Sequence, residues 1–195
     1  MRSSESVSGS GSENLQTEFL IKELDVLFNK LSVTSILDIP CGDFNWMQRV
    51  NLTNIKYIGA DIVEEIVLSN DLKFKKDGII NFSVLNLISD QLPKSDVVFV
   101  RDCFVHLSYS DISNAIINIR LSGSKYLLTT TFTNHNLNHD IITGEWRPLN
   151  LQKKPFNFPM PLVTINERCT EGNGEYKDKS MSLWNLDDDF FLNKF

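Results

Sequence analysis

Cysteine is scarce in this sequence, and its few copies lie far apart. The 195 residues contain three cysteines, Cys41, Cys103 and Cys169, and no two of them form a Cys-x-x-Cys pair. This spacing indicates neither a disulfide framework nor a zinc site, and it is typical of a protein from a reducing compartment. We therefore expect a cytoplasmic location.

Long apolar runs and an excess of positive charge are missing as well. Polar residues follow Met1, and no stretch approaches the roughly 20 apolar residues that cross a bilayer. The net charge is −6, whereas a protein that binds a phosphate backbone usually presents a basic face. The composition predicts a soluble protein with neither a membrane nor a nucleic acid as partner, and it leaves the oligomeric state open.

Serine and glycine dominate the N-terminal residues 1–14, which include S-V-S-G-S-G-S. Such a composition predicts a flexible segment, either a tail or linker without a role or a flap that folds over a ligand. The flap is retained as an alternative because small residues allow the backbone to approach a ligand closely. The remaining residues, 15–195, are of the right number for a single domain with a substantial core.

Strand-like and helix-like segments alternate along this domain. The clearest strand is D-V-V-F-V-R at residues 96–101, which is β-branched and almost continuously apolar. The alternation predicts an α/β fold with a mostly parallel sheet that is covered by helices on both faces. We expect strands at residues 35–39, 57–62, 81–87, 96–101, 125–132, 162–168 and 180–186, and helices at residues 12–31, 44–50, 63–70 and 108–122.

The helix at residues 108–122 has clear end signals. Ser108 and Asp111 form a capping-box pattern with Asp in place of Glu, and Gly123 lies where a C′ glycine belongs. Residues 133–161 show no clear period and form a long loop, which is usually functional in a compact domain. The sequence ends in an acidic and aromatic stretch, D-D-D-F-F, which we expect to be an exposed tail.

The stretch from Ser35 to Asp61 contains the first chemical signal. A strand-length apolar run ends in Asp38, the turn P-C-G-D follows, and a second apolar run ends in Asp61. This order is that of a βαβ unit that holds a nucleotide-like ligand at the carboxyl edge of a sheet. Gly42 lets backbone N–H groups approach a ligand, and an acid at Asp61 suits two ribose hydroxyls. The alternative for either acid is a turn cap.

The sequence from Asp38 to Phe44 resembles the first motif of class I S-adenosylmethionine-dependent methyltransferases. That motif is an acid and any residue followed by Gly-x-Gly-x-Gly, and only its central glycine, Gly42, is present here. Phe44 departs from the pattern at the third glycine. The similarity covers roughly residues 20–132 and implies a Rossmann-like fold with a mostly parallel seven-stranded sheet, and S-adenosyl-L-methionine as cofactor.

The resemblance also implies which residues bind the cofactor. Asp38 suits its methionine ammonium, directly or through water. Asn86 and Leu87 correspond to an adenine-contacting pair, in which an amide oxygen bonds the adenine amine and an apolar side chain packs on the ring. The alternative for Asn86 is a polar strand end. The full set is Asp38, Pro40, Cys41, Gly42, Asp43, Phe44, Trp46, Asp61, Ile62, Asn86, Leu87 and Arg101, and for Trp46 a core position is the alternative.

Asp102 and His106 are the candidate catalytic residues. They belong to V-R-D-C-F-V-H-L, which resembles the family's motif after the fourth strand. Methyl transfer to a hydroxyl needs a base, and a helical turn between these residues would let Asp102 orient His106. The alternative is a structural histidine that caps the helix. His135, His139 and Asp140 form a possible metal cluster, but the surrounding asparagines favour a loop, and we predict no metal site.

The acceptor is predicted from residues 133–161, where the family carries its acceptor lid. Trp146, Arg147 and Asn157 offer an aromatic face and polar donors that suit a small, ring-shaped polar acceptor. We expect O-methylation of a sugar or nucleotide-sugar hydroxyl, because relatives with a P-C-G-D-F-N-W motif look like proteins of polysaccharide biosynthesis. The alternatives are a small amine acceptor, an inactive binding module, and a nicotinamide-dependent oxidoreductase, which would require G-x-G-x-x-G.

Overall fold

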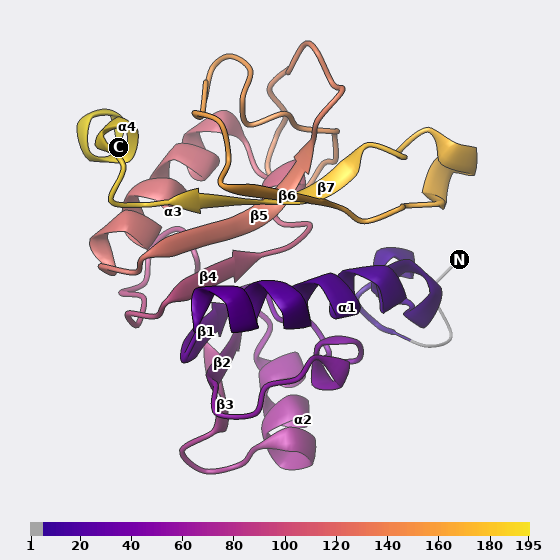
Figure 1. The fold of residues 1–195 in the computed structure, drawn as a ribbon, viewed down its shortest axis with the longest axis vertical. Helices are drawn as coiled ribbons and strands as arrows, with labels where there is room; N and C mark the ends of the chain where they lie inside the picture. The colour runs from indigo at the N-terminus through magenta and orange to yellow at the C-terminus, as the bar shows by residue number, and fades with distance from the viewer. Residues whose placement is uncertain (1–5) are drawn as a thin grey trace.

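The structure is a computed structural model that describes residues 6–195. Its centre is one seven-stranded sheet in the order β3-β2-β1-β4-β5-β7-β6 (Figure 1). All strands run parallel except β7, which is antiparallel to both of its neighbours. This confirms the predicted mostly parallel sheet of seven strands. The strands are β1 (Ser35–Asp38), β2 (Lys56–Asp61), β3 (Ile80–Val84), β4 (Val97–Val100), β5 (Tyr126–Phe132), β6 (Val163–Asn166) and β7 (Lys179–Asn185).

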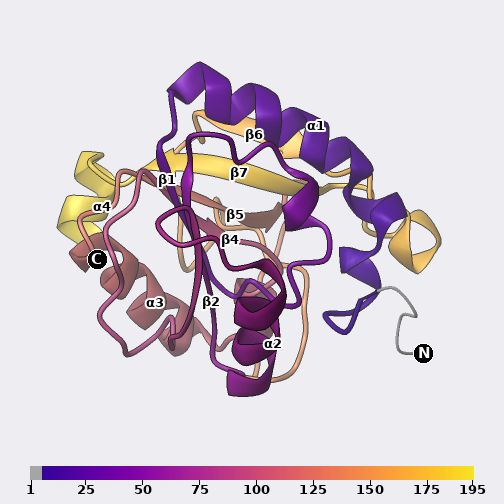
Figure 2. The same cartoon turned by 90° about the horizontal axis from the view of Figure 1, so that it is seen from below.

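Helices cover both faces of the sheet, as predicted. Figure 2 shows α1 and α3 on opposite sides of the central strands. The α-helices are α1 (Asn14–Leu31), α2 (Glu64–Phe74), α3 (Tyr109–Leu121) and α4 (Asp189–Lys194), and the short 3-10 helices are η1 (Ser10–Ser12), η2 (Met47–Arg49), η3 (Phe104–His106) and η4 (Glu171–Gly174).

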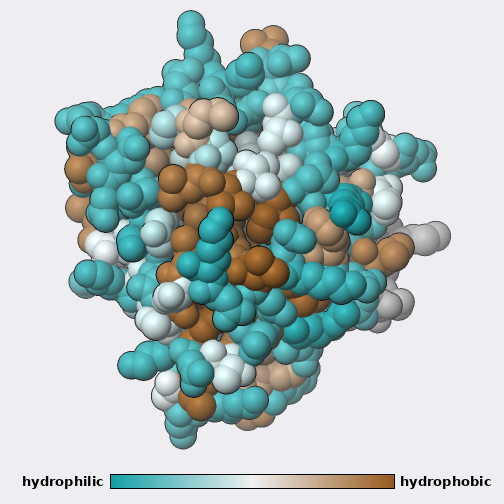
Figure 3. All heavy atoms as spheres, viewed as in Figure 1, coloured by the Kyte–Doolittle hydropathy of each residue, from teal (hydrophilic) through white to brown (hydrophobic). Residues whose placement is uncertain are grey.

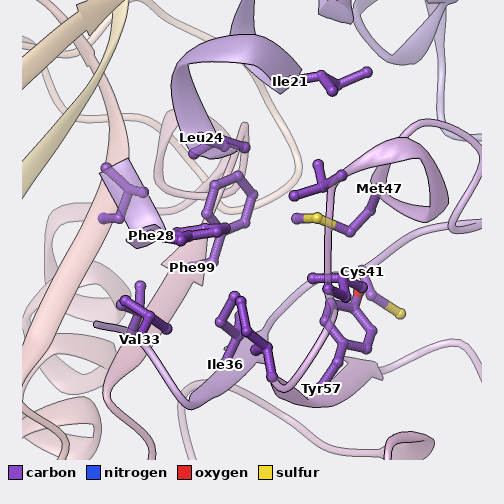
Figure 4. Packing of buried hydrophobic residues seen from close by; sticks show 14 of the residues in the cluster. Ile21, Leu24, Phe28, Val33, Ile36, Cys41, Met47, Tyr57 and Phe99 are labelled. Carbon is purple, nitrogen blue, oxygen red and sulfur yellow. The ribbon is translucent and has the colours of Figure 1, made fainter. Parts of the chain in front are cut away.

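Alternating side chains of the strands divide the core into two clusters. Along β4, Val97 and Phe99 belong to the cluster beneath α1, whereas Val98 and Val100 belong to the cluster beneath α3. Figure 4 shows the first cluster, where Leu24 and Phe28 of α1 approach Phe99. This alternation follows from the period of two in a strand, and burial of each large apolar side chain contributes about 1.5–3 kcal/mol.

The surface on the α1 side is mostly hydrophilic. Figure 3 shows an apolar area near the centre of this face, crossed by hydrophilic residues. Phe19, Leu31 and Val163 are only partly buried where they pack against the first cluster. Within residues 6–195, no helix is both long and apolar enough to cross a membrane.

The predicted signals at the ends of α3 are confirmed. The Ser108 hydroxyl accepts a hydrogen bond from the Asp111 amide at 3.2 Å. Gly123 follows the helix with a φ of 70°, a conformation that a glycine adopts without a steric penalty. The helix packs against the sheet through Ile112, Ala115, Ile116 and Ile119, all of them buried.

The predicted helix at residues 44–50 is wrong. Only η2 (Met47–Arg49) forms there. Phe44 has a φ of 58°, and the Asp43 carboxylate accepts a hydrogen bond from the Asn45 amide at 3.2 Å. Such a side-chain bond competes with a helix start, and a left-handed residue cannot continue an α-helix.

The helix after β2 and the C-terminus also differ from the prediction. The expected helix at residues 63–70 runs on to Phe74 as α2 (Glu64–Phe74). The expected exposed tail forms α4 instead, with Asp188 as N-cap. Phe191 of α4 is fully buried, and its ring lies 4.9 Å from that of Phe158. Burial of an aromatic ring stabilises a helix that its acidic sequence alone would not.

The long segment between β5 and β6 contains neither helix nor strand, as its lack of period predicted. It nevertheless contributes to the core, since Leu149, Leu151, Phe156 and Phe158 are buried in the α3 cluster. His135 and His139 lie in this segment. Among residues 6–195 there is no group of three or more His, Cys, Asp or Glu side chains that could hold a metal ion.

Candidate functional site

A cavity of about 540 Å³ lies at the carboxyl edge of the sheet. Its walls come from residues 8–12, the turn after β1, the ends of β2 and β4, and the region around the start of β7. Pockets of this size bind ligands as large as a nucleotide. The predicted site residues that line the cavity are Asp38, Pro40, Cys41, Gly42, Trp46, Asp61, Arg101, Asp102, His106 and Trp146.

Gly42 lies in the turn after β1. Its φ of 55° is left-handed, and a Cβ atom at this position would overlap the Ser8 side chain. The Gly42 amide donates to the Asp61 carboxylate at 3.1 Å, and the Asn70 side chain donates to the Gly42 carbonyl at 2.7 Å. Hydrogen bonds with Asn70 of α2 and Asp61 of β2 therefore stabilise the turn. The turn requires glycine both for its left-handed φ and because a Cβ atom would overlap Ser8.

Asp61 ends β2 beside this turn. One carboxylate oxygen accepts from Gly42 N, and the other accepts from Val63 N at 3.0 Å. Asp61 thus caps two backbone amides, as its alternative interpretation predicted. Each carboxylate oxygen has a second lone pair, so Asp61 retains acceptor capacity toward the cavity that it lines.

Asp38 ends β1 and is almost fully buried, with 2% of its surface exposed. Burial raises the pKa of this carboxyl to about 7, although a hydrogen bond of 2.5 Å from the Tyr57 hydroxyl works in the opposite direction. A buried acid that is near its ionisation point and borders a cavity will lose its proton when a cation binds next to it.

The N-terminal segment forms part of the cavity wall. Residues 8–12 line it, and the Ser10 hydroxyl donates to Glu171 at 2.6 Å. Asp43 accepts from the Ser6 hydroxyl and from the Val7 amide, each at 2.8 Å. We refer to residues 6–12 as the flap, and their role over a ligand stays a prediction. Residues 1–5 of the predicted flexible segment lie outside the described residues.

Four charged side chains form an ionic cluster beside the flap. Arg101 follows β4 and contacts Glu167 at 2.7 Å, while Lys179 begins β7 and contacts Asp102 at 2.6 Å. Arg101 also donates to the Gly11 carbonyl of the flap at 2.8 Å. Burial alone would raise the pKa of Asp102, but Lys179 and Arg101 outweigh it and hold that pKa below its usual value. Asp102 is therefore ionised and is a weak base.

His106 ends η3 and is exposed at the cavity. Its Nδ1 lies 2.9 Å from the Glu145 carbonyl oxygen. Because a carbonyl only accepts, Nδ1 carries the proton and Nε2 of the neutral ring is the acceptor. The predicted orientation of His106 by Asp102 is wrong, since the partner of its ring is Glu145.

Aromatic rings surround the cavity near His106. Trp146 and Tyr176 lie with ring centroids 5.0 Å apart, and Phe132 is 6.1 Å from Trp146. A second hollow of about 310 Å³ shares Phe132 and Tyr176 with the first cavity. The rings of Phe132, Trp146 and Tyr176 thus form one aromatic wall of the cavity.

The remaining predicted cofactor residues do not line the cavity. Phe44 packs in the core, with its ring 5.1 Å from that of Tyr57. The side chain of Asn86 bonds locally, since its oxygen accepts from the Ile88 amide at 2.9 Å. Leu87 is buried and Ile62 is exposed. Asp43 contributes indirectly, because it holds the flap.

Two of the predicted acceptor residues also lie elsewhere. Arg147 is buried and donates to the carbonyls of Phe104 and Leu107 at 2.7 and 2.8 Å. Asn157 donates to the Pro155 carbonyl at 3.3 Å. Only Trp146 of the three borders the cavity.

Several lining residues were not found from the sequence. Glu171 and Tyr176 come from the connection between β6 and β7, and Lys179 is the first residue of β7. The turn-rich composition of this connection predicts a loop but not which edge of the sheet that loop reaches. Lys179 is an ordinary charged residue at a strand start, and no local signal indicates its ion pair with Asp102.

Solved structures share this fold at low sequence identity. The methyltransferase domain of bacterial CtHen1 matches with a TM-score of 0.63, 9% identity, and coverage of 88% of this chain and 100% of that chain. The N-methyltransferase NodS from Bradyrhizobium japonicum WM9, solved with S-adenosyl-L-homocysteine, matches with a TM-score of 0.62, 11% identity and 91% of each chain. The chain has the class I methyltransferase fold.

Human N-acetylserotonin methyltransferase, solved with S-adenosylmethionine, matches with a TM-score of 0.56 and 12% identity, over 90% of this chain and 59% of that chain. No protein-family model and no curated protein matches the sequence. In the class I methyltransferase fold of this chain, the cavity lies where the strand order reverses, between β1 and β4. Open α/β sheets bind ligands at such a switch point.

Proposed function

We propose that this protein is an S-adenosylmethionine-dependent methyltransferase. The observation that carries the proposal is the pair of buried acids, Asp38 and Asp61, which end adjacent strands and border one cavity on either side of the Gly42 turn. The cavity matches this cofactor in size and chemistry. Asp61 suits ribose hydroxyls, Asp38 suits the methionine ammonium, and Gly42 leaves room where a Cβ atom would intrude.

The two ends of the cavity have different chemistry. Val63 and Ile66 line it beyond Asp61 and offer an apolar surface for a purine ring. Asp102, His106 and Trp146 line the opposite part, where the acceptor binds. When bound, S-adenosylmethionine supplies an electrophilic methyl group on a sulfonium. The flap residues 8–12 then exclude water from that group.

His106 is the proposed general base. Nε2 of His106 would take the proton of the acceptor hydroxyl, while S-adenosylmethionine, held by Asp38, Asp61 and the Gly42 turn, would supply the methyl group and keep the electron pair of the carbon–sulfur bond. The bond from Nδ1–H to the Glu145 carbonyl keeps the ring in the tautomer that can accept this proton. Asp102 is ionised and paired with Lys179, so it contributes fixed negative charge next to the base.

The preferred acceptor is a hydroxyl of a sugar or a nucleotide-sugar, as in polysaccharide biosynthesis. Aromatic faces next to carboxylates and a lysine ammonium suit a polyhydroxylated ring. The second hollow behind Phe132 and Tyr176 offers space for a further ring of the same acceptor. A small amine is the second candidate, because the carboxylates of Asp102 and Glu171 border the acceptor end and would attract an ammonium.

Methyl-transfer assays test this proposal. We expect production of S-adenosylhomocysteine when the protein is incubated with S-adenosylmethionine and a panel of sugars and nucleotide-sugars. Turnover with small amines but not with sugars or nucleotide-sugars would contradict a hydroxyl acceptor and support an amine acceptor. Binding of the cofactor without turnover on either panel would contradict the enzyme and favour an inactive binding module.

A further inference from the structure

Residues 144–147 hold the chain segment that carries His106. Each of four consecutive carbonyl oxygens in that segment accepts a hydrogen bond from them. The Phe104 and Leu107 carbonyls accept from the Arg147 guanidinium at 2.7 and 2.8 Å, the Val105 carbonyl accepts from the Arg147 amide at 3.1 Å, and the His106 carbonyl accepts from the Gly144 amide at 2.8 Å. We refer to residues 144–147 as the clamp.

Arg147 is the central residue of the clamp. Its side chain is 1% exposed, and its Nε donates to a further carbonyl, that of His139, at 3.3 Å. The Tyr109 ring lies 5.7 Å from the guanidinium carbon. Burial lowers the pKa of Arg147, which means that placing this cation among carbonyls costs desolvation free energy. A hydrocarbon side chain would fill the space without that cost but would leave the carbonyls unpaired.

The clamp also sets the chemistry of the His106 ring. Glu145, within the clamp, provides the carbonyl that fixes the Nδ1–H tautomer. Trp146, between Glu145 and Arg147, borders the cavity. The wall of the acceptor site and the support of the base are thus the same four-residue segment.

We propose that Arg147 is a positioning residue for the general base, which rests on the proposed role of His106. Arg147 fixes η3 on one side and the Glu145 carbonyl on the other, so that Nε2 of His106 faces the acceptor. This differs from direct binding of substrate, because the guanidinium donates to backbone carbonyls and is buried.

Nitrogen-15 NMR of the histidine rings in the 195-residue protein tests the proposal. The sequence has three histidines, so His135→Gln and His139→Gln variants assign the His106 signals. Wild type should show the Nδ1–H tautomer at neutral pH, and Arg147→Ala should show a mixture of both tautomers. Arg120→Ala is the matched control, because Arg120 also donates to a backbone carbonyl, that of Phe195 at 3.1 Å, and should retain the wild-type tautomer.

The same variants are then compared in turnover. Arg147→Ala should lower kcat about tenfold to a hundredfold, the range expected for a displaced catalytic group, with S-adenosylmethionine affinity close to wild type. Arg147→Lys keeps the charge but cannot reach both carbonyls, so it should show intermediate values, and it replaces the alanine variant in both tests if that variant does not fold.

Two results would overturn the proposal. One is an unchanged His106 tautomer in folded Arg147 variants, and the other is a kcat no lower than that of Arg120→Ala. The NMR measurement needs no methyl acceptor. A wild-type protein without turnover therefore contradicts the proposed function, whereas an unchanged tautomer contradicts the positioning role.

Discussion

At the scale of single residues, the site depends on a few side chains whose surroundings differ strongly. Asp38 is buried and accepts one hydrogen bond from the Tyr57 hydroxyl, whereas the negative charge of Asp102 is balanced by ion pairs with Lys179 and Arg101. Burial raises the pKa of the first to about 7, and the two cations hold the pKa of the second below its usual value despite its burial. Two acids at neighbouring strand ends thus have different protonation states near neutral pH.

The raised pKa of Asp38 makes cofactor binding depend on pH. Between pH 6.0 and 7.5 the affinity for S-adenosylmethionine should rise, because ionised Asp38 pairs with the methionine ammonium, which stays protonated up to a pKa of about 7.7. Calorimetry in buffers of different ionisation enthalpy should detect proton release on binding below pH 7. Asp38→Asn should remove this release, and an equal release by the variant would contradict the assignment.

The same pKa has a consequence for stability. A carboxyl whose folded pKa is raised stabilises the folded state fully below its unfolded pKa of about 3.9, and this contribution is lost as the pH rises through the folded pKa. The ligand-free protein should therefore lose the Asp38 contribution as the pH rises through about 7. Asp38→Asn should gain in melting temperature relative to wild type over this window, as differential scanning fluorimetry would show.

Gly42 should be sensitive to a single methyl group. Gly42→Ala places a Cβ at a φ of 55° and against Ser8. The variant should lose roughly 1–3 kcal/mol of stability through local strain and further stability through the overlap with Ser8, and its cofactor affinity should fall. Gly78→Ala is the control, because Gly78 has a φ of 76° but nothing within 4 Å of an added Cβ. Chemical denaturation that finds equal losses for both variants would contradict the close approach of the flap.

His106 should affect chemistry rather than cofactor binding. His106→Gln should lower turnover on a hydroxyl acceptor by about a hundredfold or more, because a general base contributes that much. The affinity for S-adenosylmethionine, measured by calorimetry, should not change. His139→Gln, on an exposed part of the loop after β5, should leave both quantities unchanged. A His106→Gln variant that is merely less stable, with normal turnover, would support a structural histidine.

At the scale of elements, most of the sheet could be predicted from the sequence. The strands follow from β-branched runs that alternate with helical segments, and the observed bounds of most of them lie within one or two residues of those expected. The helix after the first turn could not be excluded, because the sequence does not show that Phe44 has a left-handed backbone and a buried ring. Likewise, α4 depends on Phe158, more than 30 residues earlier, for the burial of its aromatic face.

The site could be predicted mainly where it follows from strand ends. Asp38, Asp61 and Asp102 border the cavity because parallel strands bring their carboxyl ends to one edge. Glu167, directly after β6, contacts Arg101, and Lys179, at the start of β7, contacts Asp102, although both are far away in sequence. Such pairs depend on the register of the β5–β7 pairing, and a single sequence does not encode that register locally.

The flap is the element whose removal should be the most informative. Deletion of residues 1–12 leaves α1 intact, since this helix begins at Asn14, but it removes the bonds to Asp43, Glu171 and Arg101. We expect S-adenosylmethionine to dissociate at least tenfold faster, since the site is then open to water. Stopped-flow fluorescence of Trp46, which lines the cavity, measures this rate. An unchanged dissociation rate would contradict a covering role.

At the scale of the whole molecule, the sheet places two functions at one edge. The β1–β2 side provides the groups proposed to bind the cofactor, and the β4–β5–β7 side provides the proposed base, the ionic cluster and the aromatic wall. The N-terminal flap contacts both sides, through Asp43 on one and Arg101 on the other. The proposed cofactor site and the proposed acceptor site are therefore joined by one segment.

The central claim is that S-adenosylmethionine binds between Asp38 and Asp61. Isothermal titration of the wild type should show saturable binding that S-adenosylhomocysteine competes away. Asp61→Asn should weaken it by roughly 1–3 kcal/mol, the cost of an unpaired polar group. Asp90→Asn is the control, because the Asp90 carboxylate accepts from Asn86 N away from the cavity. Absence of binding to the wild type, with NADH bound instead, would contradict the account.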